Sequence, residues 1–78
     1  MKSKAINKYF AKVVLLAINE SQKSKKYLFQ INYMEDSYSL YVFEKQDNEV
    51  VYSSLSNSLN FKNLRNTKRK ILKMMEEK

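Results

Sequence analysis

Six cationic residues lie close together near the C-terminus of this chain of 78 residues, and they are the side chains best suited to bind a ligand. No acidic residue occurs between Val50 and Met75, so nothing within that segment neutralises them. Lysine and arginine bind phosphates and carboxylates through charge-assisted hydrogen bonds. The run therefore indicates an anionic partner; its members are Lys62, Arg65, Lys68, Arg69, Lys70 and Lys73.

On a helix, all of these cations except Lys68 share one outer arc. Lys68 falls inside the apolar stripe of the same segment, so we expect its aliphatic stem to follow the edge of the core rather than meet a partner. Such a helix can dock on a core through one stripe and present positive charge through the other. The apolar stripe consists of Phe61, Leu64, Ile71, Leu72 and Met75.

The N-terminal segment is also basic, because the first 19 residues contain four lysines and no acid. We expect the two terminal segments to form one surface that binds nucleic-acid phosphates, with an affinity that falls at high salt. The alternative is a solvated surface that only keeps a small domain soluble. The expected contacts outside the C-terminal run are Lys4, Lys8, Lys12, Lys23, Lys25 and Lys26.

Catalysis has little support in the composition, since the chain contains no histidine and no cysteine. Glycine is absent too, which excludes a phosphate-binding glycine loop. Two pairs of acids, Glu35 with Asp36 and Asp47 with Glu49, do not match a calcium loop and are interpreted as solvated turn residues. The sequence therefore predicts no enzyme activity, no cofactor and no metal site.

The N-terminal pattern predicts a helix from Ser3 to about Asn19. A strand over residues 9–18 is the alternative, because that stretch contains several β-branched residues. On the helix, Leu15 and Ile18 are left on the outer side, which either marks a homodimer contact or counts against the helix. The packed side holds Ile6, Tyr9, Phe10, Val13, Leu16 and Ala17.

The middle of the chain changes to a period of two, which is typical of strands. We expect strands at about residues 27–33, 38–44 and 50–54. The second has apolar residues on both faces, which is typical of a central strand. Polar turns separate them, at Glu35 with Asp36 and at Asp47 with Asn48. The aromatic residues of these strands are expected in the core or at a protein contact rather than under stacked bases, because no basic residue alternates with them.

The helical period returns at Phe61 and predicts a second helix from Ser58 to about Glu77, with N-cap candidates at residues 56–58. A start at Asn66 or Thr67 is the alternative. The fold class is α+β in the order α-β-β-β-α. It is a three-stranded antiparallel meander with two helices packed on one face, forming one domain over residues 1–78.

This order is similar to that of the double-stranded-RNA-binding domain, whose second helix begins with phosphate-contacting lysines. Lys68, Arg69 and Lys70 stand at a comparable place. The family's first hairpin loop carries glycine, proline and histidine for minor-groove contact, whereas residues 34–37 here include Glu35 and Asp36, which would repel phosphate. The resemblance extends to the order of elements and a few residues, and serves as an analogy of shape.

The sequence favours a small non-enzymatic protein that binds duplex DNA or RNA. The alternative is a protein-binding regulator or inhibitor that acts on an acidic host protein; a composition rich in lysine and asparagine fits a phage or mobile element. Attachment to a membrane surface through the basic helix would need a larger apolar face. The apolar run at residues 13–18 is too short for a secretory signal or a membrane span, so we expect a cytoplasmic protein.

Overall fold

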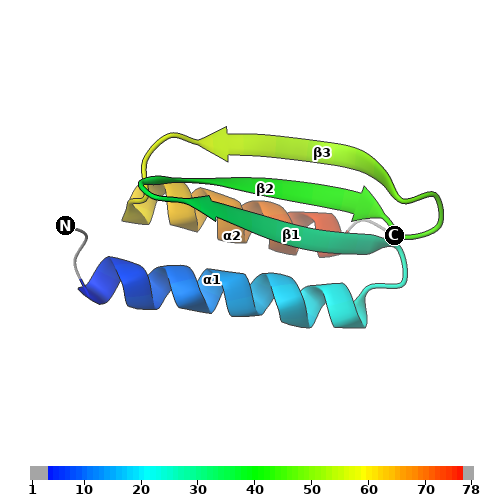
Figure 1. Cartoon of the computed structure of the whole chain (residues 1–78). Coiled ribbons are helices and arrows are strands. Elements are labelled where there is room, and N and C mark those ends of the chain that lie inside the picture. The colour runs from blue at the N-terminus through cyan, green and yellow to red at the C-terminus, as the bar shows by residue number, and fades with distance from the viewer. Residues whose placement is uncertain (1–3, 77–78) are drawn as a thin grey trace.

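The computed structural model describes residues 4–76, which form five elements in the order α-β-β-β-α (Figure 1). Both helices cover the same face of the sheet and run side by side in the same direction (Figure 1). This confirms the predicted α+β class and meander. The elements are α1 (Lys4–Lys23), β1 (Tyr27–Met34), β2 (Ser37–Glu44), β3 (Glu49–Ser56) and α2 (Phe61–Glu76).

The sheet is antiparallel with the strand order β1-β2-β3, so β2 is the central strand, as its two apolar faces predict. Phe29 pairs with Val42, which pairs in turn with Tyr52, and all three side chains lie on the face that the helices cover. A bulge follows, because Phe43 pairs with Val50 and leaves Val51 as the extra residue of β3. The alternation of side chains along each strand therefore produces one covered and one uncovered face.

The core lies between the sheet and the helices and forms two adjoining clusters. α2 contributes Leu64, Thr67, Ile71 and Met74, which follow one another at intervals of three and four residues. Phe61 and Leu72, which we expected in this stripe, are 40% and 38% exposed. The predicted stripe is wrong at these two positions because α2 is rotated so that they face the side of α1 rather than the sheet.

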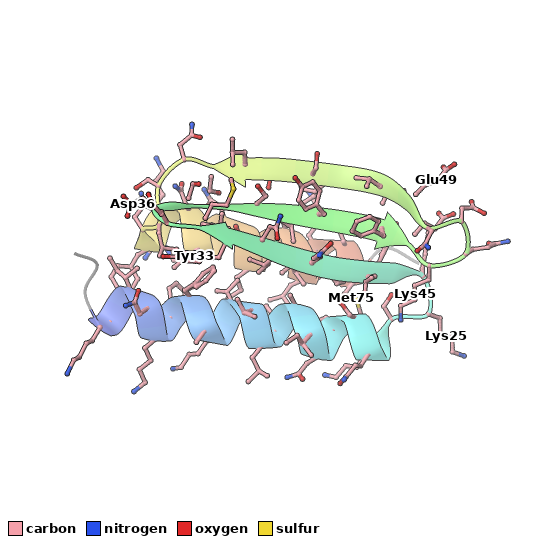
Figure 2. All side chains as sticks on the ribbon, in the orientation of Figure 1. Lys25, Tyr33, Asp36, Lys45, Glu49 and Met75 are labelled. Atoms are coloured by element: carbon pink, nitrogen blue, oxygen red, sulfur yellow. The ribbon has the colours of Figure 1, made fainter. Side chains whose placement is uncertain are left out.

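The helix ends differ from the predicted ones. α1 continues four residues beyond Asn19. The Lys45 ammonium donates hydrogen bonds of 2.6 Å to Ser21 O in the last turn of the helix and to Ser24 O just after it (Figure 2). α2 begins at Phe61, where the Asn60 side chain accepts a hydrogen bond of 2.8 Å from the Asn63 amide as an N-cap. The predicted N-caps at residues 56–58 are therefore wrong, and so is the alternative start of the helix at Asn66 or Thr67. Ser3 and Glu77 lie outside the described residues.

Both hairpin turns use a non-glycine residue with a positive φ angle, Glu35 at 45° and Asn48 at 60°. Asparagine tolerates this left-handed region, whereas glutamate does so at a cost of about 1 kcal/mol. We expect Glu35→Gly to raise the free energy of unfolding by about 0.5–1 kcal/mol in urea titrations. Glu35→Ala removes the same carboxylate without relieving the φ angle and should bring no gain. Equal stabilisation by both variants would contradict this explanation.

Candidate functional site

A groove runs between α1 and α2 on the side of the helices away from the sheet. It consists of two hollows of about 330 Å³ and 220 Å³ that share Tyr9 and Lys12 in their walls. We call it the helix groove. Every residue that lines it belongs to a helix: Ala5, Lys8, Tyr9, Lys12, Val13 and Leu16 on α1, and Phe61, Arg65 and Lys68 on α2.

The helical period places the cations of the groove. Lys8 and Lys12 are one turn apart on the side of α1 that faces α2, and Arg65 and Lys68 are similarly spaced on the opposing side of α2. All four are exposed. Because the two helices run in the same direction, their N-terminal halves lie together, and the Tyr9 and Phe61 rings pack with their centroids 5.7 Å apart. The groove thus has an aromatic wall flanked by four positive charges.

The groove is free of acidic side chains along most of its length. No acid occurs in residues 4–19 of α1 or 61–75 of α2, and Glu20 pairs with Lys23 at 3.3 Å. The acids of the sheet lie at its two ends, with Asp36 at the first hairpin and Glu49 near the second (Figure 2). The partial positive charges of two adjacent helix N-termini add to the cations. The outer helical surface therefore carries a concentrated positive potential that favours anions.

The predicted site residues other than Lys70 separate into three locations. Lys8, Lys12 and Arg65 meet in the groove, so the structure brings the two basic ends of the sequence together there. Exposed cations of α2 adjoin it, namely Lys62, Arg69 and Lys73, and Lys4 is exposed at the start of α1. A third group lies at the opposite end of the molecule, around a hollow of about 440 Å³ beside Met74 and Met75: Lys23, Lys25 and Lys26.

Lys70 departs from the predicted outer arc. It is half-buried, and its ammonium lies 4.3 Å from the centroid of the Tyr52 ring, on the side of α2 that faces β3. This cation–π contact holds the side chain over the sheet. Lys70 also lines a hollow of about 160 Å³ whose other polar residues are Ser54, Ser56, Asn63, Asn66 and Thr67. The prediction that Lys70 shares a surface with Arg65 is therefore wrong.

Lys68 is the cation that sequence reasoning left out of the site. It does lie at the edge of the core, beside Val13 and Leu16 of α1, as its place in the stripe predicts. Its side chain is nevertheless exposed and shares the wall of the groove with Lys12. The helical period predicts the direction in which Lys68 points from the axis of α2. It does not predict that α1 lies on that side, so Lys12 could be identified as a neighbour only from the fold.

No family model, curated protein or solved structure matches this chain. Within residues 4–76, no helix combines the length and apolar character that crossing a membrane requires. The same residues contain no cluster of three or more acidic side chains placed to hold a metal ion.

Proposed function

We propose that this protein binds nucleic acid through the helix groove and the adjoining outer side of α2, with Lys8, Lys12, Arg65 and Lys68 as the central phosphate contacts. The observation that carries the proposal is the meeting of cations from both ends of the sequence in one groove free of acids. Phosphate contacts of this kind supply most of the affinity of non-specific nucleic-acid binding.

The dimensions of the surface fit a phosphate backbone. α2 has 16 residues and is therefore about 24 Å long. A DNA strand presents one phosphate per 3.4 Å or so of duplex axis, but it winds around that axis, so a straight helix can meet only some of the roughly seven phosphates within its length. Exposed cations recur every three or four residues from Lys62 to Lys73, so their charges extend over about 16 Å of the helix. An isolated acidic side chain of a protein would engage only one or two of them.

A salt titration tests the nature of the contacts. With about four phosphates neutralised, the logarithm of the binding constant should fall with the logarithm of salt concentration at a slope near −3.6. Raising salt from 50 to 200 mM should then weaken binding roughly 100-fold for duplex DNA and duplex RNA probes, measured by fluorescence anisotropy. Absence of binding to either duplex at low salt would refute the proposal.

A purification experiment separates this proposal from an acidic protein partner. Protein purified at low salt should carry nucleic acid, seen as raised absorbance at 260 nm that nuclease and high-salt washing remove. If nuclease leaves a stoichiometric acidic protein bound to the groove, the partner is a protein and nucleic-acid binding is refuted.

A further inference from the structure

The face of the sheet opposite the helices is uncovered, and none of its side chains is charged. We call it the open face. Its composition is unusual here, because 29% of the whole chain is charged. The open face comprises Leu28, Gln30, Asn32 and Met34 of β1, Ser37, Ser39, Tyr41 and Phe43 of β2, and Val50, Val51, Ser53 and Leu55 of β3.

Apolar side chains dominate this face. The Tyr41 and Phe43 rings lie side by side on the central strand, with centroids 6.4 Å apart. A neutral apolar face on a small protein marks a contact site. Its most exposed members, between 41% and 60% accessible, are Leu28, Met34, Val50, Val51 and Leu55.

We propose that the open face is a homodimer interface, in which the sheets of two copies pack face to face. Among the ways in which two copies can meet, the charge distribution favours contact through the open face. Two chains with a net charge of +7 repel each other, and this repulsion is smallest when their neutral faces meet and their basic helical layers point in opposite directions. An acidic partner would instead be attracted to the helices.

The open face has a hollow at one end and a protruding side chain at the other, so two copies of it can fit together. A hollow of about 440 Å³ lies at one end, lined by Leu28, Gln30, Phe43 and Asn48 together with Phe29. Met34 stands at the other end of β1, 57% exposed and six residues from Leu28, hence about 20 Å away. A two-fold axis perpendicular to the strands and parallel to the sheets reverses the strand direction. It therefore places Met34 of each copy over the hollow of the other.

The size of the face sets the expected affinity. Three strands of eight residues cover about 14 Å by 26 Å, or roughly 370 Å² before the relief of the side chains is counted. That flat area is below the roughly 600 Å² that the smallest specific interfaces bury on each partner, and only the protruding side chains add to it. We therefore expect a dimer that dissociates in the micromolar range.

Sedimentation equilibrium from about 5 to 500 μM tests the dimer. The wild-type chain should change from monomer to dimer over this range, and a monomer throughout would overturn the proposal. Met34→Lys with Leu55→Lys should remain monomeric, since it places charges on both edge strands at one end of the open face, and the two-fold axis repeats them at the other end of the interface. Leu15→Lys with Ile18→Lys is the matched control on α1, with residues of similar exposure. It should dimerise normally; if only this control becomes monomeric, the contact lies on α1 and the proposal fails.

Cysteine cross-linking tests the packing and does not depend on the folding of the lysine variants. The chain contains no cysteine, so there is no background reaction. The double variant Leu28→Cys with Met34→Cys should give a disulfide-linked dimer under mild oxidation. Leu15→Cys with Ile18→Cys should cross-link at least tenfold more slowly. Equal rates for the two variants would overturn the two-fold arrangement.

Discussion

Reversing the charges of Arg65 and Lys68 together is expected to lower the affinity for nucleic acid more than 100-fold. Both side chains line the helix groove and both are exposed, so Arg65→Glu with Lys68→Glu should leave the fold intact. A hydrogen bond to a charged group contributes about 1.5–3 kcal/mol, and each glutamate adds repulsion to the lost contact. Fluorescence anisotropy at constant low salt measures the affinity, and circular dichroism confirms folding.

The matched control moves the same change of charge to the other end of the molecule. Lys25→Glu with Lys26→Glu also makes two reversals, so both double variants lower the net charge from +7 to +3. Lys25 and Lys26 lie beside Met74 and Met75, away from the groove. We expect this control to weaken binding less than tenfold. An equal loss in both variants would show that net charge, rather than the groove, governs binding.

The second large effect is expected on stability, from Ser21→Ala. Ser21 is 6% exposed, and its hydroxyl accepts a hydrogen bond of 2.8 Å from the Phe29 amide. The same hydroxyl lies 2.6 Å from Ala17 O and 3.2 Å from Phe29 O. The hydroxyl thereby pairs with the amide and the carbonyl of Phe29 on the edge of β1 that has no neighbouring strand. Alanine would leave the Phe29 groups buried without this partner, at a cost of about 1–3 kcal/mol for each group.

We expect Ser21→Ala to lower the free energy of unfolding by about 2–4 kcal/mol, after a small gain in helix propensity is included. For a domain of this size, that corresponds to a decrease of Tm by about 8 °C or more. Ser53→Ala on the exposed side of β3 is the control and should change stability by less than about 0.5 kcal/mol. A Tm within 3 °C of wild type for Ser21→Ala would contradict the proposed role of the hydroxyl.

The order of the elements could be predicted because the apolar period changes from 3.6 to 2 and back along the chain. Polar turns mark each change, and α1 was favoured over a strand for the same reason. The central position of β2 followed from its two apolar faces. These are local signals that the surrounding structure reinforces.

The exact ends of the helices could not be predicted. Residues 56–58 and Asn60 are all good N-caps by type, and the choice depends on where β3 ends and which way the chain turns. α1 extends to Lys23 because Lys45, more than 20 residues away, binds carbonyls in and just after its last turn. Such a tertiary contact leaves no trace in the sequence near the helix end.

The candidate site was predicted as a charge pattern but not as a shape. Sequence periodicity gives the angle of each cation around its own helix, and does not say which element lies next to it. For this reason the predicted site included Lys70, which turns to Tyr52, and omitted Lys68, which faces Lys12 across the groove. Of these two cations, Lys70 departs from its predicted place, whereas Lys68 lies at the core edge as predicted and also lines the groove.

The bulge at Val51 affects how this protein can assemble. β3 pairs only with β2 among the described residues, so its other edge could add strands from further copies and produce an open-ended fibre. A bulge bends an edge strand and interrupts the regular row of hydrogen-bonding groups that such growth requires. On β1, Ser21 occupies the free edge at Phe29 in a similar way. Because both edges are blunted, we expect association to occur through the flat of the sheet, as in the proposed dimer, rather than through strand addition.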